Sequence, residues 1–359
     1  MLSLLARFTP MQQAQTEAER EAIFRFRYFI YGRELRRDYP GMDHARGVLE
    51  QDEDHRPETR LYYTGTPQEL TGTCRARVWA APPADIVEEL SLQRMPPVRL
   101  AYLERAMVRP TLRGRLILPA MIWHGYALLM EEGVEACVLT CVPGLARHYL
   151  RMGARPYGAR LVEGASSAEV PLIILMNDVA HMQRTRSFMA PQMKRRARPF
   201  DPAPFAPLFA APQPLCFDPR EIQAGLRAAR PPMFEGVSRS ALGAIARTAF
   251  LLDVPQGGLV VRKGTAEREM YVVLSGELDV NDGAARIVPG EAMGEVAFLG
   301  SPGLRTATVR ARRPSRLLVL RRKFLEELAG RDPRAAYTIS RNLARVVADR
   351  FGELRSSVG

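Results

Sequence analysis

The proline content of residues 189–232 constrains this chain more than any other feature of its sequence. Ten of the chain's 28 prolines fall in this stretch. Because proline lacks a backbone donor and fixes φ, we expect no regular helix or central strand there. A chain of 359 residues is also too long for one ordinary core. We therefore expect a domain over 1–188, a linker over 189–232 and a second domain over 233–359. The linker either floats or packs over a domain through its large apolar residues, Leu208, Phe209, Leu215 and Phe217.

The first domain alternates stretches of helical spacing with short apolar runs. This pattern predicts an α+β fold with one mixed sheet and flanking helices. We expect helices over Glu17–Leu35, Leu116–Glu131 and Gly144–Met152. We expect strands over Arg60–Tyr63, Gly72–Trp79, Leu100–Val108, Ala136–Cys141 and Val170–Met176.

The second domain opens with a short predicted helix over Arg239–Ala249. Short apolar runs then alternate with regularly spaced glycines, which is typical of a β-barrel or jelly roll. Two helices are expected at the end, over Arg322–Leu328 and Arg334–Leu354. The last helix carries an apolar stripe that is either core or a lid over a ligand, made of Ile339, Leu343, Val346, Val347 and Phe351.

The net charge of +12 comes from arginine, since only three of the 51 basic residues are lysine. The arginines are dispersed and accompany no DNA-binding motif, so we expect acidic ligands such as phosphates or acyl carrier proteins, and no DNA. No apolar run approaches the roughly 20 residues of a membrane helix, and the N-terminus lacks the pattern of a signal peptide. The four cysteines and five histidines show no metal-ligand spacing. We therefore expect structural thiols, no metal and a cytoplasmic protein.

A possible site for a cyclic phosphoribose lies between residues 294 and 309. Backbone N–H groups of the turn at Gly294 can hold a phosphate, and Arg305 can add a charge-assisted fork to it. Glu295 can accept a hydrogen bond from a ribose 2′-hydroxyl. Three apolar residues pack the turn against the barrel: Val296, Ala297 and Phe298.

These residues resemble the phosphate-binding cassette of cyclic-nucleotide-binding domains. The resemblance runs over about 233–357, with further matches at Val254–Gly258, Arg262–Gly264 and Tyr271–Glu277. It implies that cAMP or cGMP binds here as a regulatory ligand, unless the pocket has lost its ligand. No helix-turn-helix follows the last helix, so we expect the first domain to be the regulated part. The cassette maps onto Gly294, Glu295, Val296, Ala297, Arg305, Thr306 and Ala307, and the threonine does not decide between the two bases.

The first domain contains a possible site for an acyl donor. The strand that ends at Met107 and Val108 is followed by a basic turn with Arg113 and Gly114 and then a helix. A splayed strand end beside a helix N-terminus can bind an anion such as a pyrophosphate. Tyr149 lies four residues before the glycine that ends another predicted helix.

Together these stretches resemble the GNAT acyltransferase superfamily over about 15–180. The resemblance implies that Met107 and Val108 pair with the donor's pantetheine arm and that Arg113 and Gly114 meet its phosphates. Tyr149 would protonate the leaving thiolate. The family's later turn glycines are Leu116 and Leu118 here, which weakens binding of a coenzyme A pyrophosphate.

The order of Phe26–Leu35, Asp52–Asp54 and Gly72–Arg77 is similar to the branch with N-acyl-homoserine lactone synthases and N-acyl amino acid synthases. That branch implies a long acyl chain, often from acyl carrier protein, and an amine acceptor. Its usual glutamate position is Tyr102, and Glu104 shares that strand face. We therefore expect Glu104 to be the general base or the group that positions the amine. Arg27 and Arg75 are candidate substrate or acyl-binding residues.

Structural alternatives exist for each of these residues. Glu104 could pair with Arg75 or Arg77, Tyr149 could pack its helix, and Arg27 could lie on a solvated helix face. The carboxylates of Asp52 and Asp54 could only solvate a loop.

The leading hypothesis is a cyclic-nucleotide-regulated acyltransferase that moves an acyl group, which we expect to be long, from acyl carrier protein or acyl-CoA to an amine. Coupling would run through the proline-rich linker and the last helix. One alternative is a lysine acetyltransferase that uses acetyl-CoA. Another is a non-catalytic nucleotide sensor with a degenerate GNAT domain. The oligomeric state does not follow from the sequence.

Overall fold

The chain divides into two compact units in the computed structural model. The structure describes residues 10–37, 39–112, 117–158, 160–164, 167–266, 269–295, 298, 304–321 and 323–358, with side chains as far as residue 350. Unit 1 comprises Met1–Cys141, Leu145–Gly158 and Val170–Pro212. Unit 2 comprises Val142–Gly144, Ala159–Glu169 and Gln213–Gly359.

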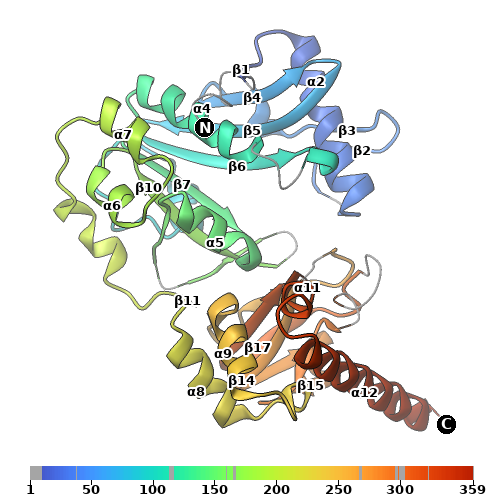
Figure 1. Ribbon diagram of the computed structural model, residues 1–359. Coiled ribbons are helices and arrows are strands. Elements are labelled where there is room, and N and C mark those ends of the chain that lie inside the picture. The colour runs from blue at the N-terminus through green and yellow to red at the C-terminus, as the bar shows by residue number, and fades with distance from the viewer. Residues whose placement is uncertain are drawn as a thin grey trace. The chain divides into compact units, whose positions relative to one another are not determined.

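Unit 1 is built on a mixed sheet (Figure 1). Strands β6 and β7 run parallel to each other, whereas the other neighbouring strands are antiparallel. The predicted α+β fold with a mixed sheet and flanking helices is confirmed. The order across the sheet is β1 (Met11–Gln13), β4 (Thr59–Thr66), β5 (Glu69–Trp79), β6 (Leu100–Val108), β7 (Ala136–Cys141), β10 (Ala168–Leu175) and β8 (Arg155–Pro156).

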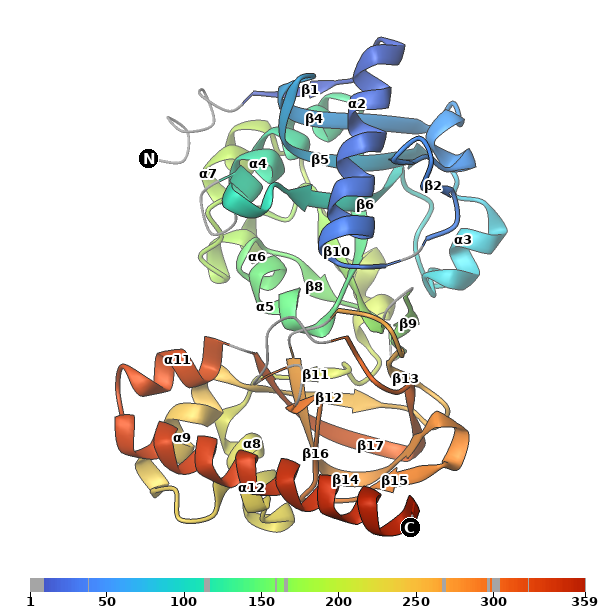
Figure 2. The ribbon, with the colours of Figure 1, turned by 90° about the vertical axis from the view of Figure 1, so that its right-hand side faces the viewer.

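The predicted helix over Glu17–Leu35 consists of two elements, α2 (Glu17–Tyr28) and the π-helix η1 (Phe29–Glu34). A capping box formed by Thr16 and Glu19 satisfies backbone donors at the start of α2. Helix α2 crosses one face of the sheet (Figure 2). The remaining elements of this unit are β2 (Met42–Asp43), β3 (Val48–Leu49), η2 (Asp52–His55), α3 (Ala84–Glu89), η3 (Pro110–Leu112), α4 (Ile117–Glu131), α5 (Pro143–Arg151), α6 (Val179–Arg184), α7 (Ala190–Arg196) and η4 (Ala203–Phe209).

The alternation of side chains along β4 separates the two faces of the sheet. Leu61 and Tyr63 belong to the core cluster under α2. Tyr62 lies between them and therefore faces the other way. Its hydroxyl donates to the carboxylate of Glu132, just after α4, at 3.4 Å. Helices thus cover both faces of this sheet.

Unit 2 is an antiparallel β-structure flanked by helices, as predicted for a cyclic-nucleotide-binding fold. The helices pack on apolar residues of β14 and β17 to form its core. Its main strand order is β11 (Leu215–Cys216), β12 (Phe250–Val254), β17 (Val309–Arg321), β14 (Glu269–Val280) and β15 (Ala285–Ile287), with β13 (Leu259–Val261) paired to β17 and β16 (Ala292–Met293) to β14. Its helices are α8 (Pro219–Ala229), η5 (Pro232–Phe234), α9 (Arg239–Thr248), η6 (Asn281–Gly283), α11 (Lys323–Ala329) and α12 (Pro333–Val358).

The expectation that no regular helix crosses residues 189–232 is wrong. Helix α8 occupies 11 residues of this segment, and α7 begins just before its first proline. Pro219 sits in the first turn of α8, where its missing N–H costs nothing, and Asp218 caps the helix. The segment also packs against the units it joins, because Leu208 is 3% exposed and Leu215 is 8% exposed.

None of the helices in the described part of the chain is long and apolar enough to cross a membrane.

Gly276 on β14 provides a test of the packing of unit 2. Its φ is +91°, and a Cβ there would lie 2.5 Å from the carbonyl oxygen of Pro314. Gly257 has a φ of +78° but no atom within 4 Å of its Cβ position. We therefore predict that Gly276→Ala lowers the free energy of unfolding by about 1–3 kcal/mol more than Gly257→Ala does. Urea unfolding measures both, and equal losses would refute the close approach.

Candidate functional sites

Strands β6 and β7 diverge in the middle of the sheet. Their ladder runs from the pair Leu100–Ala136 to the pair Leu103–Leu139 and ends there, although β6 continues to Val108. On its other edge β6 stays paired to β5, with a bulge after Glu104. The predicted donor-binding residues Met107 and Val108 therefore lie beyond the last pair with β7. The other two predicted donor-binding residues, Arg113 and Gly114, lie outside the described residues.

A cluster of charged side chains lies on the face of the sheet under α2. Arg27 on α2 donates from Nη1 to both carboxylate oxygens of Asp54 at 2.8 Å, and both side chains are 0% exposed. Arg75 on β5 donates to the same carboxylate at 3.1 Å. Asp54, which lies in η2, thus joins a helix to a strand. The alternative of a solvated Arg27 is wrong, and so is the alternative that Asp54 solvates a loop.

Glu104 on β6 belongs to the same charged cluster. Arg75 holds it with two bonds, from Nε at 3.2 Å and from Nη2 at 3.1 Å. Arg77 adds a bond from Nε at 2.7 Å. The pairing considered as an alternative for Glu104 is therefore present with both arginines.

The electrostatics of the cluster keep Asp54 ionised. Burial works to raise the pKa of its carboxyl, but the charges of Arg27 and Arg75 outweigh it and hold the pKa below its ordinary value. Burial also lowers the pKa of the Arg27 guanidinium, and Asp54 opposes that shift. Each buried charge is therefore tolerated because of the others.

Tyr149 lies near the end of α5, the helix that follows β7, and is half-buried. Its carbonyl accepts hydrogen bonds from the N–H groups of Met152 and Ala154, which end the helix. Among the predicted catalytic and substrate residues, the structure joins Arg75 to Glu104 directly and Arg27 to Arg75 through Asp54.

Arg105 is not among the residues predicted from the sequence, but it lies next to Glu104 on β6. It occupies the β6 bulge with a φ of +54°, which is rare for a residue other than glycine. Its guanidinium lies 4.6 Å from the ring centroid of Tyr39 and 5.5 Å from that of Tyr31. No sequence pattern signals a positive φ at an arginine, so only the structure could reveal this contact.

In unit 2, the structure brings Gly294 and Arg305 together. Arg305 is 4% exposed and donates from Nη2 to the carbonyl of Glu269 at 2.6 Å. Its guanidinium lies 5.7 Å from the ring centroid of Tyr271. Gly294 has a φ of +83°, and a Cβ there would collide with Nη1 of Arg305. Glycine is therefore required where the backbone approaches this buried cation.

The remaining predicted nucleotide-binding residues surround this pair. Glu295 is 7% exposed and accepts a 2.6 Å bond from Nη1 of Arg350 on α12. Thr306 is exposed and Ala307 half-buried. Val296 and Ala297 lie outside the described residues.

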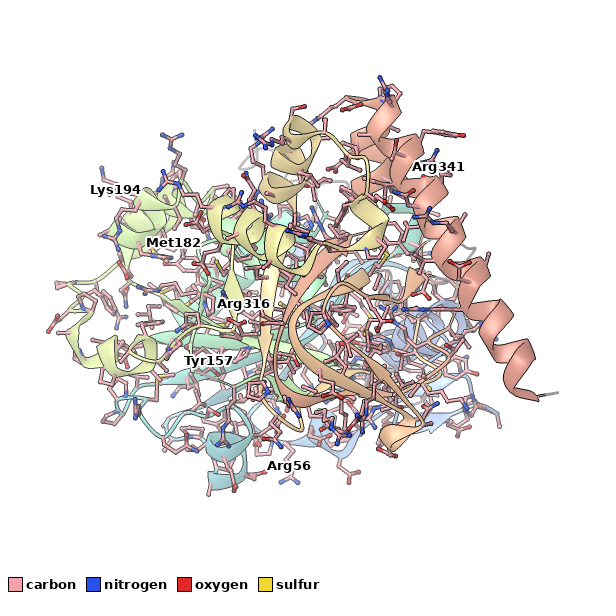
Figure 3. All side chains as sticks on the ribbon, turned by 90° about the horizontal axis from the view of Figure 1, so that it is seen from below. Arg56, Tyr157, Met182, Lys194, Arg316 and Arg341 are labelled. Carbon is pink, nitrogen blue, oxygen red and sulfur yellow. The ribbon has the colours of Figure 1, made fainter. Side chains whose placement is uncertain are left out.

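Helix α12 combines core residues with a contact to the predicted site. Ile339 and Leu343 are 0% exposed and belong to the core of unit 2. Arg341, labelled in Figure 3, lies on its exposed side. Near its end, Arg350 reaches Glu295 and also donates to the carbonyl of Ala292 at 2.7 Å. The apolar stripe is therefore core at its first two residues. Through Arg350 the helix also contacts Glu295, whose carboxylate is predicted to bind the ribose.

The buried pair of Arg27 and Asp54 gives a prediction for stability. We expect Arg27→Met to lower the free energy of unfolding by about 3–5 kcal/mol, because it leaves part of a buried charge unpaired. The control is Arg46→Met, because the ion pairs of Arg46 are exposed and worth about 0–1 kcal/mol.

The same pair gives a prediction for pH. Because the pKa of Asp54 is lowered in the folded state, the pair's contribution is present above the ordinary carboxyl pKa and is lost as the pH falls through the folded-state value. Urea unfolding against pH measures both, and equal losses in the two variants would contradict the assignment.

Comparisons with known proteins identify part of unit 2. Residues 251–332 match the family model of the cyclic nucleotide-binding domain. A protein of Rhodopseudomonas palustris described as a potassium channel protein is 30% identical over 144 residues, which make up 36% of this chain and 35% of that protein. The chain thus spans about a third of the length of this relative.

Two solved structures are also similar to parts of the chain. A cyclic nucleotide-binding domain from Methylobacillus flagellatus is 19% identical with a TM-score of 0.34, over 38% of this chain and 80% of that one. An N-acyl amino acid synthase from uncultured soil microbes is 14% identical with a TM-score of 0.39, over 51% of this chain and 97% of that one. The family match, which includes Gly294 and Arg305, shows that unit 2 contains a cyclic nucleotide-binding domain.

Proposed function

We propose that this chain is an acyltransferase regulated by cAMP or cGMP. It would move a long acyl chain from an acyl carrier protein or CoA thioester to an amine such as an amino acid. The observation that carries the catalytic half is the divergence of β6 from β7 next to the buried charged cluster. In this proposal a pantetheine arm would run along β6 at Met107 and Val108, beyond Leu103, where the ladder between β6 and β7 has ended.

The reaction needs few groups from the protein. The amine nitrogen attacks the thioester carbonyl carbon, the C–N bond forms, the C–S bond breaks, and one proton passes from the nitrogen to the thiolate. We assign Glu104 to hold the amine and accept its proton, and Tyr149 to protonate the thiolate. Arg75 contacts Glu104 directly and is a candidate for the substrate's charged group. Arg27 acts through Asp54 as a positioning residue, because both of its bonds go to that carboxylate.

The regulatory half rests on three residues of unit 2. A cyclic phosphate would take the guanidinium of Arg305 and the backbone donors of the turn at Gly294. A ribose 2′-hydroxyl would donate to Glu295, which Arg350 already contacts. The buried position of Arg305 supports this assignment, because a charge shielded from water binds an anion more strongly.

A second reading is a nucleotide sensor whose first unit has no activity. The contacts of Glu104 with Arg75 and Arg77 favour it, because they occupy the carboxylate that the reaction needs. Assays of nucleotide binding and of acyl transfer therefore have to be made separately.

For the nucleotide site we predict that Arg305→Gln weakens cAMP and cGMP binding about tenfold to a hundredfold, since a hydrogen bond to a charged group is worth about 1.5–3 kcal/mol. The matched control is Arg312→Gln, which changes an exposed arginine on β17, the strand that follows Arg305 in the sequence. Isothermal calorimetry gives the affinities. An affinity unchanged by Arg305→Gln would remove the assignment of the phosphate site.

For the catalytic site we predict thiol release from long-chain acyl carrier protein or long-chain acyl-CoA in the presence of an amino acid pool. Glu104→Gln should lower kcat at least about a hundredfold, the lower range for loss of a general base. The control is Glu132→Gln, which pairs with Arg60 in the same unit. Turnover with acetyl-CoA alone would favour a lysine acetyltransferase, and no turnover with any donor would favour the sensor.

A further inference from the structure

A short hairpin connects the chain of unit 1 to the folded structure of unit 2. Strand β9 (Val162–Glu163) pairs with the first two residues of β10, so that Glu163 lies opposite Ala168 and Val162 opposite Glu169. We call the described residues 160–164 and 167–169 the clasp hairpin. They belong to unit 2, whereas the rest of β10 belongs to unit 1 and pairs with β7.

Glu163 fixes the clasp hairpin through two arginines of unit 2. Arg310 on β17 grips its carboxylate with two bonds, at 2.9 Å to Oε1 and 3.1 Å to Oε2. Arg262, just after β13, donates to Oε1 at 2.8 Å. On the other side of the hairpin, Ser167 forms a β-bridge with Val261, and both residues are nearly inaccessible. Both strands of the hairpin therefore contact the same edge of unit 2.

The turn that carries Arg262 also holds the proposed phosphate-binding arginine. The N–H of Gly264 donates to the carbonyl of Arg305 at 2.8 Å, and the N–H of Arg305 donates to the carbonyl of Thr265 at 2.8 Å. The hydroxyl of Thr265 donates back to the carbonyl of Arg262 at 2.7 Å. One residue, Lys263, thus separates the arginine on Glu163 from Gly264, whose N–H is bonded directly to the backbone of Arg305.

We propose that the clasp hairpin transmits nucleotide binding at Arg305 to strand β10. A phosphate that draws the Arg305 guanidinium away from the Glu269 carbonyl also shifts the backbone of Arg305. This backbone is hydrogen-bonded to Gly264 and Thr265, so the shift reaches the turn that carries Arg262. Arg262 then changes its grip on Glu163, and the hairpin passes the change along the chain into β10. This inference rests on the proposed nucleotide site and names the contact through which that site acts on the first unit. Coupling of this kind requires that the nucleotide bind two arrangements of the hairpin with different affinity.

Hydrogen exchange of β10 tests this proposal without an activity assay. In the full-length wild-type protein, saturating cAMP or cGMP should change the exchange rates of amides in residues 168–175 at least threefold. Glu163→Gln should abolish that change and leave nucleotide binding measurable. The control is Asp253→Asn, because Asp253 accepts two similar bonds from Arg316 and is similarly exposed, at 40% against 48% for Glu163. It should keep the full response.

The outcomes separate this inference from the proposed function. Calorimetry that detects no nucleotide binding to the wild type would overturn the proposed nucleotide site and the inference with it. Binding without any change in β10 would overturn the inference alone, and so would a full response in Glu163→Gln. Raising the salt to 1 M should weaken the response, because these ion pairs are partly exposed and screened.

Discussion

The carboxylate of Asp54 is the point on which unit 1 depends. It has no contact with water, and it is bound by one arginine from α2 and one from β5. Without Asp54, the guanidinium groups of Arg27 and Arg75 would be buried without the carboxylate that joins them. The position of α2 over the sheet, the orientation of Arg75 and the grip on Glu104 therefore follow from one ion pair. The proposed substrate site is built on this frame.

Unit 2 solves a similar problem with glycine instead of a carboxylate. Arg305 is buried beneath a turn, and the backbone approaches it closely only because residue 294 has no side chain. Its carbonyl partner, Glu269, and its aromatic neighbour, Tyr271, both lie on β14. The cation is thus held against the strand by a carbonyl oxygen and an aromatic ring, and in the proposed function a phosphate would compete with them.

Much of the fold could be predicted from local pattern, because short apolar runs bounded by turn residues are typical of β-strands. Strands β6 and β7 begin and end at the predicted residues. The order of motifs in the second domain also anticipated the family match over residues 251–332. Helix α8 was missed because the prolines were counted over the segment, whereas the interval between Pro219 and Pro231 holds none.

The parts that could not be predicted depend on contacts distant in sequence. The burial of Asp54 follows from arginines 27 and 21 residues away, and an acidic run alone resembles a solvated loop. The grip of Arg310 on Glu163 spans 147 residues. Coupling through the linker and the last helix remains a prediction from the sequence, and coupling through the clasp hairpin is a separate proposal.

The affinity for cyclic nucleotide, measured with and without a saturating long-chain acyl donor, decides whether the two units form one regulated protein. Linkage requires reciprocity: if the nucleotide changes the affinity for the donor by some factor, the donor changes the affinity for the nucleotide by the same factor. We predict a change of at least about fivefold, the lower end of typical couplings. An affinity that is the same with and without a donor that demonstrably binds would contradict regulation of donor binding by the nucleotide.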